Sequence, residues 1–349
     1  MTYQAIFVLL SGLAVTAQDR RTQRSMLLAL AALLVLFVGT RRWVGCDFNG
    51  YLKRFEIYTL LVDLGRGSEI LERAEAGFGL VNLAVIHAGL DYYWINITCA
   101  VIFFACLVTF AGRRESPLTL LTLAFPILIV QLAMSGLRQA TATALLMLAF
   151  DAFSRRKRLA MVVWVLLASS FHATALMFLP LVLAVGRRPS LVGLVVGTLV
   201  AIPFAVLFAG ERIDVYQDRY GGGDVVSFGA VFRTALIVST AILFERYRRE
   251  FERLYPRDYA LMRLFSIFAF GLAIITMISS IAAHRIGFYL MPIHILTLAR
   301  LPRAMAAGGR VDPMLALMPF LVYGAYILVW FTTSRHANLC YTPYDSYLL

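Results

Sequence analysis

Polar side chains that can do chemistry occur in six short segments of a very apolar chain. The segments are GTRRWVGCDFNGY at 39–51, AEAGFGLVN at 74–82, SGLRQ at 135–139, SSFHAT at 169–174, DRYGGG at 218–223 and AHRIGFY at 283–289. An ionisable group inside or beside a membrane-length apolar run is costly unless it has a partner, so such groups mark candidate functional sites.

The residue types in these segments suit an anionic, phosphorylated substrate. Arg41, Arg138 and Arg285 carry planar guanidinium groups, which match the paired oxygens of a diphosphate. His172 is a side chain that can take a proton from a sugar hydroxyl near neutral pH. The sequence contains no Asp-x-Asp pair and no His and carboxylate cluster at metal-ligand spacing. We therefore expect arginines, with no metal and no cofactor, to neutralise the charge of the leaving group.

Structural roles are alternatives for most of these residues. Asp47 can pair with an arginine or cap the following helix, and Glu75 can begin a helix as an N-terminal acid. His172 can be a neutral histidine bonded to a backbone carbonyl. Arg138 is harder to explain in this way, because it opens an apolar run after a very short turn and needs an anionic partner there. Membrane-interface or loop roles are alternatives for Arg42, Arg219, His284 and Arg285.

The chain as a whole has the composition of a multi-pass membrane protein. It has 349 residues, of which 60% are hydrophobic and 15% charged, and its mean hydropathy is +0.78. Soluble domains carry about 25% charged residues. The net charge of +12 lies mostly in short tracts between apolar runs, which indicates membrane topology and not nucleic-acid binding. The expected fold is all-α, a single integral membrane domain over 1–349.

The basic tracts orient the expected spans. Placing them all in the cytoplasm leaves about twelve apolar runs as crossings, with both termini on the outer face. The expected spans are 3–17, 26–39, 92–111, 116–133, 137–153, 159–171, 173–186, 190–209, 229–244, 259–281, 286–300 and 313–331.

Three segments depart from simple crossings. Residues 40–76 carry balanced charge, so we expect an outer loop that forms part of the site. Residues 77–90 are apolar but too short to span, and a re-entrant or interfacial helix fits them better. Only 28 residues separate Arg158 from Arg187. They form either two short helices or a hairpin that bends at 169–172, where irregular backbone must line a cavity or be buried in protein.

The cysteines and the C-terminal tyrosines have simpler interpretations. Cys99 and Cys106 lie in one apolar run and are expected to pack. Cys46 and Cys340 fall in segments that we place on the outer face, where an oxidising compartment permits a disulfide, and the sequence leaves this pairing open. An aromatic belt at the membrane interface is the expectation for Tyr341, Tyr344 and Tyr347.

Taken in order, these segments resemble the EpsG family of Wzy-type bacterial exopolysaccharide polymerases. The resemblance is carried by Arg41, Val44-Gly45-Cys46-Asp47 and Tyr51, by Glu75-Ala76-Gly77-Phe78 and Asn82, by Arg138-Gln139, by Phe171-His172-Ala173-Thr174-Ala175, by Arg285 and Tyr289, and by Asn338 and Pro343-Tyr344. Arg42 stands where an aromatic residue is usual, and Cys46 stands where a small hydroxyl residue is usual. Residues 218–223 and the tail match only loosely.

The resemblance implies an activity at the outer face of the bacterial inner membrane. A growing glycan would pass from undecaprenyl diphosphate to a hydroxyl of the next lipid-linked repeat unit. The implied partners are these lipid-linked glycans, membrane lipids and a chain-length regulator.

The expected site residues follow from their chemistry. His172 is the expected general base, with Asp47 and Glu75 as alternatives. The expected contacts to diphosphate or other parts of the substrate are Arg41, Arg138, Gln139, Arg285, Tyr51, Tyr289 and Arg219.

Two other functions fit the same residues. A flippase or transporter of lipid-linked sugars would use the arginines for binding alone, but it should show inverted repeats, and the sequence shows no such symmetry. An O-antigen ligase shares the diphosphate chemistry, and the sequence separates it poorly from a polymerase.

Overall fold

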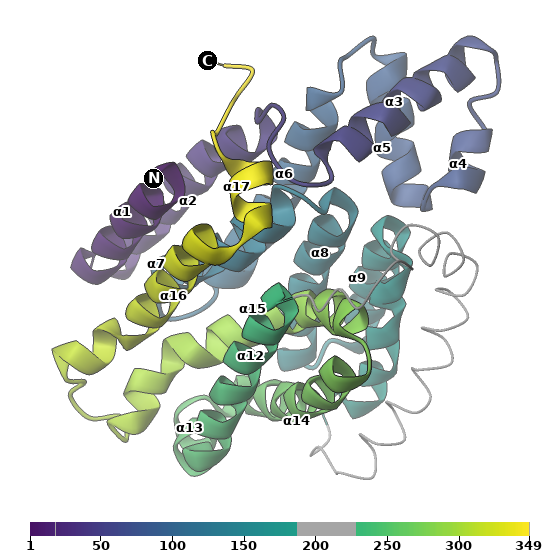
Figure 1. Ribbon diagram of the computed structural model, residues 1–349. Helices are drawn as coiled ribbons and strands as arrows, with labels where there is room; N and C mark the ends of the chain where they lie inside the picture. Colours follow the sequence, from purple (N-terminus) through teal and green to yellow (C-terminus); the bar gives the residue numbers. More distant parts are fainter. Residues whose placement is uncertain (18, 187–227, 349) are drawn as a thin grey trace. The chain divides into compact units, whose positions relative to one another are not determined.

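The computed structural model describes residues 1–17, 19–186 and 228–348, which fold almost entirely as helices (Figure 1). Among these residues the β-type pairing is an isolated antiparallel bridge between Arg41 and Ser346. The all-α prediction is therefore confirmed for the described chain. The expected span at 190–209 and the candidate substrate residue Arg219 lie outside the described residues.

The helices follow the apolar runs because a backbone in an apolar medium must satisfy its own hydrogen bonds. In chain order they are α1 (Thr2–Thr16), α2 (Arg20–Gly39), α3 (Phe48–Asp63), α4 (Glu69–Arg73), α5 (Ala76–His87), α6 (Tyr93–Gly112), α7 (Pro117–Ala124), the π-helix η1 (Phe125–Ala133), α8 (Leu137–Ser154), α9 (Arg158–Phe171), the 3₁₀ helix η2 (Ala173–Ala184), α12 (Phe228–Arg246), α13 (Arg248–Leu254), α14 (Pro256–Ile278), α15 (Ser280–Met305), α16 (Pro313–Thr333) and α17 (Arg335–Tyr341).

Four described helices, α2, α6, α14 and α16, are long and apolar enough to cross a membrane. Five further apolar elements have 10–17 residues. At 1.5 Å per residue an α-helix of that size is about 15–25 Å long, whereas the hydrocarbon core of a bilayer is about 30 Å thick. The chain thus has the helices of a membrane-embedded protein, and the number of twelve crossings stays a prediction.

The contacts of the chain divide it into two compact units. Unit 1 comprises 1–147, 167–172 and 319–349, and unit 2 comprises 148–166 and 173–318. In unit 1, α2 packs along α6 and α1 packs on α7. In unit 2, α12, α14 and α15 pack against one another in pairs.

The expected outer loop is largely helical. Helices α3, α4 and α5 contact one another (Figure 1) around a small apolar cluster of Tyr58, Leu61, Ile70 and Ala74. Side chains of α5 pack on this cluster, so the segment builds its core together with the apolar helix expected at 77–90. That helix is α5, and its 12 residues are too few to span a bilayer.

The sequence left open two short helices or a bend at 169–172, and the structure has a helix break at His172. Helix α9 ends at Phe171, and the chain continues from Ala173 in 3₁₀ geometry. The 28 residues therefore hold two short helical segments that meet at the candidate base.

The C-terminal tail packs into unit 1. Tyr341 is buried, and its hydroxyl donates to the backbone carbonyl of Gln131. Tyr344 stacks on Phe37 and donates to that residue's carbonyl at 2.8 Å. The predicted interface belt is therefore wrong for Tyr341, which is buried in the protein, and stays a prediction for the half-buried Tyr344. Tyr347 remains 43% exposed.

Replacing Tyr344 with Phe should destabilise the protein. The substitution keeps the ring on Phe37 but leaves the Phe37 carbonyl without its donor, which costs about 1 kcal/mol. Thermal unfolding in detergent, followed by fluorescence, measures this loss. Tyr347→Phe is the matched control, because that side chain is more exposed, and an equal shift in both variants would show that the tail is not anchored at Tyr344.

Candidate functional site

A buried ion pair between Arg138 and Glu75 lies at the centre of the candidate residues in unit 1. Arg138 is the second residue of α8, and Glu75 is the residue before α5. The Arg138 Nη1 donates to Glu75 Oε2 at 2.6 Å, and the two side chains are only 12% and 13% exposed. The sequence required an anionic partner for Arg138, and the fold supplies Glu75 from 63 residues away.

Arg138 influences the pKa of its partner Glu75 and of the nearby Tyr51. Burial raises the pKa of Glu75, but the charge of Arg138 and its hydrogen bond outweigh burial and hold the pKa below the ordinary value of 4.5. Burial raises the pKa of Tyr51, and the nearby charge of Arg138 works in the opposite direction. Tyr51 lies close enough to Arg138 for the two side chains to interact electrostatically. Glu75 is thus an ionised carboxylate with low affinity for a proton, and the Tyr51 hydroxyl is neutral.

Arg138 retains a donor that the pair does not use. Its Nε is buried and makes no hydrogen bond to any described residue. A buried donor without an acceptor is destabilising by about 1–3 kcal/mol. An oxygen atom of a ligand would remove this cost, so the guanidinium group is suited to binding an anion while Glu75 holds it in place.

His172 lies beside this pair because α5 approaches the end of α9 closely. An added Cβ at Gly77 would lie 2.5 Å from Ser170 Oγ and 3.0 Å from the Ser170 carbonyl oxygen and the Phe171 ring, so a larger residue there requires its neighbours to move. This close contact places His172 near enough to Glu75 for the two to interact electrostatically. The glycine of the Glu-x-Gly-Phe segment therefore has a spacing role.

Asp47 reaches the turn that opens α8. It occupies the N-cap position of α3 but makes no capping hydrogen bond with its side chain. Its Oδ2 instead accepts a hydrogen bond from Ser135 Oγ at 3.2 Å. The backbone N–H of Asp47 donates to Ser135 Oγ at 3.3 Å. Sequence reasoning did not assign a role to Ser135, although it is the first residue of the SGLRQ segment.

Arg41 joins the same loop to the same turn. Its side chain is fully buried, and Nε donates to the carbonyls of Val44 at 3.2 Å and Met134 at 3.0 Å. Its Nη1 donates to the carbonyl of Val38 at 2.5 Å. Backbone carbonyls therefore accept from the Nε and Nη1 donors of Arg41, which we expected to contact a diphosphate. This geometry suits a residue that positions the loop before α3.

The remaining described candidates lie in both units, and each is described within its own unit. Gln139 is buried in unit 1. Tyr289 is fully buried in unit 2, and its hydroxyl lies 2.8 Å from Thr174 Oγ1. Arg285 is partly buried near the start of α15.

Sequence reasoning also missed a buried arginine in unit 2. Arg233 donates from Nη1 to the carbonyl of His284 at 3.0 Å, and its guanidinium carbon lies 3.7 Å from the centre of the Phe288 ring. The available signal was a single charge inside the apolar run of 229–244.

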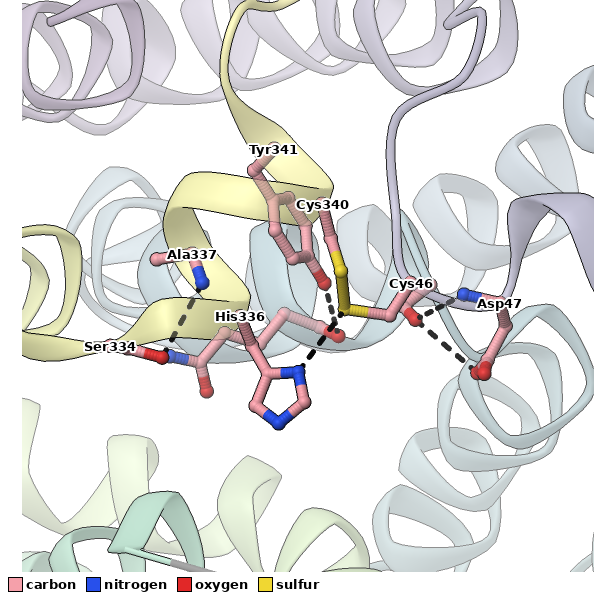
Figure 2. Close-up of a disulfide and its surroundings, with 9 residues drawn as sticks. Cys46, Asp47, Ser334, His336, Ala337, Cys340 and Tyr341 are labelled. Carbon is pink, nitrogen blue, oxygen red and sulfur yellow. Dashed lines mark hydrogen bonds between the residues drawn. A yellow bond between two sulfur atoms is a disulfide. The ribbon is translucent and has the colours of Figure 1, made fainter. Parts of the chain in front are cut away.

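Three residues of types that can bind a metal ion lie close together in unit 1. The ligand atoms of Cys46, His336 and Cys340 all lie within 4.8 Å of one another. The two sulfurs are joined as a disulfide, shown in Figure 2, so neither thiolate is free to bind a metal in this form. The cysteine pairing that the sequence left open is therefore present.

Removing the carboxylate of Glu75 should destabilise the protein strongly. Glu75→Ala leaves Arg138 buried without its partner, so we expect a loss of about 3 kcal/mol, measured by thermal unfolding in detergent. Glu69→Ala is the matched control, since its arginine partners are exposed and such pairs contribute about 1 kcal/mol or less. Equal losses in both variants would contradict the central role of the pair.

The effect of Glu75 should also depend on pH. Its folded pKa is lower than 4.5, so its stabilisation is present above pH 4.5 and is lost as the pH falls through the folded pKa. The difference in unfolding temperature between the wild type and Glu75→Ala should therefore narrow in acid.

Comparison with known proteins gives one match. Residues 25–346 match the EpsG family, a range that includes every candidate residue discussed above. No curated protein and no solved structure matches the chain. The match covers nearly the whole chain, and the chain therefore belongs to the EpsG family.

Proposed function

We propose that this protein is a polysaccharide polymerase of the bacterial inner membrane. In this proposal it moves a growing glycan from undecaprenyl diphosphate onto a hydroxyl of a lipid-linked repeat unit at the outer face. Membership of the EpsG family and the long apolar helices support the general role. The observation that carries the mechanism is Arg138, held by Glu75 beside His172 with its Nε donor unfilled.

Arg138 is the proposed diphosphate ligand. The bond between the donor sugar and the phosphate oxygen breaks, and its electron pair stays on the diphosphate. A fixed guanidinium group in a water-poor site stabilises that developing charge, because its orientation is set before the reaction. Glu75 accepts from Nη1 and thereby holds the group in this orientation. Tyr51 lies close enough to interact electrostatically with this group.

His172 is the proposed general base. The acceptor hydroxyl forms the new bond to the donor sugar, and its proton passes to the imidazole of His172. The ionised carboxylate of Glu75 then stabilises the imidazolium ion. Glu75 itself is a poor base because Arg138 keeps its pKa low, so we assign it to positioning. Asp47 is exposed and fixed to Ser135, a placement that fits contact with the acceptor.

The other residues complete the proposal. Arg41 holds the loop before α3 against the turn before α8, so we assign it to positioning. Gln139, Arg285, Tyr289 and Arg219 remain proposed substrate contacts from the sequence. The mechanism uses no metal and no cofactor, and the proposed partners are lipid-linked glycans, membrane lipids and a chain-length regulator.

Replacing His172 with Ala should stop polymer formation. Loss of a general base lowers a rate by about 10²–10⁴-fold. In cells that express the variant at the normal level, single lipid-linked repeat units should accumulate on the outer leaflet. Gel profiles of the lipid-linked glycans and a leaflet-specific label measure this. His87→Ala is the matched control, since His87 is exposed on α5, and it should keep the normal polymer.

Other outcomes identify other functions. Repeat units confined to the cytoplasmic leaflet would indicate a flippase. Normal polymer that is no longer attached to a lipid core would indicate a ligase. Normal polymer that is attached normally would show that His172 is a structural histidine.

Arg138→Lys should separate charge from geometry. Lysine keeps a positive charge beside Glu75 but lacks the planar group and its Nε donor. We expect correct folding with polymerisation slowed at least about tenfold, which corresponds to about 1.4 kcal/mol. The measurement is the rate of polymer appearance at matched protein level. Arg73→Lys, in an exposed pair with Glu69, is the control and should behave as wild type. Wild-type rates for Arg138→Lys would exclude a role for the Nε donor.

A further inference from the structure

The disulfide between Cys46 and Cys340 joins the loop before α3 to helix α17 at the C-terminal end (Figure 2). The two cysteines are 294 residues apart in sequence. Cys46 is exposed and Cys340 is partly exposed, so another protein can reach the bond. By contrast, Cys99 and Cys106 are buried.

A histidine stands next to the bond. His336 Nδ1 lies 3.9 Å from Cys46 Sγ, and Figure 2 shows its ring directed at the sulfurs. His336 precedes Cys340 by four residues, which places both side chains on one face of α17. An imidazole N–H in this position can donate to a Cys46 thiolate and so favour Cys46 as the leaving group in thiol–disulfide exchange.

The bond is coupled to the proposed site through a short series of contacts in unit 1. The Gly45 N–H donates to the Cys340 carbonyl at 2.7 Å, and Asp47 is hydrogen-bonded to Ser135. A Cβ added at Gly45 would lie 1.9 Å from the Met134 carbonyl oxygen, so this loop is pressed against the turn before α8. Arg138 follows three residues after Ser135. The disulfide therefore fixes one end of the loop that supports the Arg138 side of the site.

We propose that the Cys46–Cys340 disulfide is a thiol–disulfide exchange site for a protein dithiol, and that its reduction loosens residues 44–47 and slows polymerisation. Only the last clause rests on the proposed function. The exchange itself and the loosening of the loop concern the molecule whatever its activity.

The exchange is a balanced two-electron reaction. A thiolate of the dithiol bonds to Cys340 Sγ, and the electron pair of the broken S–S bond leaves on Cys46 Sγ. The Cys46 thiolate accepts a hydrogen bond from His336 and takes a proton from water. The second thiol of the dithiol then displaces Cys340 and becomes oxidised to a disulfide. This chain ends with two thiols, and the partner ends with one disulfide.

The first test follows the bond in the folded, full-length protein in lipid nanodiscs. Reduced thioredoxin is the dithiol probe, and free thiols are counted by the gel shift that a polyethylene-glycol maleimide produces. We expect two thiols to appear without unfolding, and His336→Ala to slow their appearance at least about fivefold. Cys106→Ser removes a buried thiol and is the matched control, with wild-type kinetics expected. A bond that resists reduction until detergent unfolds the protein would overturn the proposal.

The attacked sulfur can be identified directly. A thioredoxin variant that lacks its second cysteine stops the reaction at the mixed disulfide, which peptide mass spectrometry then locates. We expect the mixed disulfide on Cys340. A mixed disulfide on Cys46 would contradict the role given to His336.

Hydrogen exchange tests the coupling without reference to activity. After reduction, the peptide that covers 44–50 should exchange its amides faster, because the bonds of Gly45 and Asp47 are released. The peptide of α5 should not change. Unchanged exchange in 44–50 would show that the bond does not control the loop.

The glycan profile tests the last step. Cells with Cys46→Ser and Cys340→Ser together should produce polymer several-fold more slowly than the wild type, and those with His172→Ala should make none. If the double variant polymerises at the wild-type rate while His172→Ala makes no polymer, the regulatory proposal is wrong and the polymerase proposal stands. If His172→Ala makes normal polymer, the proposal that His172 is the general base is wrong, whatever the redox tests show.

Discussion

A buried guanidinium group at the start of a helix needs an anionic partner, and the arrangement of unit 1 depends on the ion pair that Arg138 forms with Glu75. Two charges that are buried lose their hydration, and only a close, well-oriented pairing offsets the free energy lost in this way. Arg138 and Glu75 meet at 2.6 Å with both side chains largely buried. The pair draws α5 to the start of α8, and α5 in turn meets the end of α9. The same pair lowers the proton affinity of Glu75 and leaves the Arg138 Nε donor open. Pairing with Glu75 thus uses one edge of the guanidinium group, and the Nε donor on the other side is left without a hydrogen bond.

Small residues and carbonyl contacts make this pairing possible. Gly77 lets α5 approach Ser170 and Phe171 closely, and a methyl group there would require these neighbours to move. Arg41 is fully buried and donates to backbone carbonyls, so its side chain joins the loop before α3 to the turn before α8. A buried arginine therefore has two uses in one unit. Arg41 holds the loop before α3, and Arg138 pairs with Glu75 and keeps its Nε donor without a partner.

The sequence predicted more of the helices than of the contacts between them. Apolar runs placed most helix boundaries within a few residues, although α2 and α15 begin six residues earlier than expected. The shortage of residues between Arg158 and Arg187 indicated two short helices or a bend at 169–172, and the structure has a helix break at His172. The requirement for an anion beside Arg138 was also correct. The burial of Tyr341 was missed, because a tyrosine near a terminus has the same composition whether it faces lipid headgroups or a protein interior.

The sequence by itself determined the helical membrane-type fold, the positions of its breaks, the family and the residue types of the site. These properties depend on local hydropathy, on charge and on motif order along the chain. Only the tertiary structure decided that Glu75, and not Asp47, pairs with Arg138, that Asp47 bonds to Ser135, and that Cys46 joins Cys340. Both carboxylates satisfied the chemistry that Arg138 requires. The choice between them depends on which helix ends meet in space, and packing between segments distant in the sequence determines that.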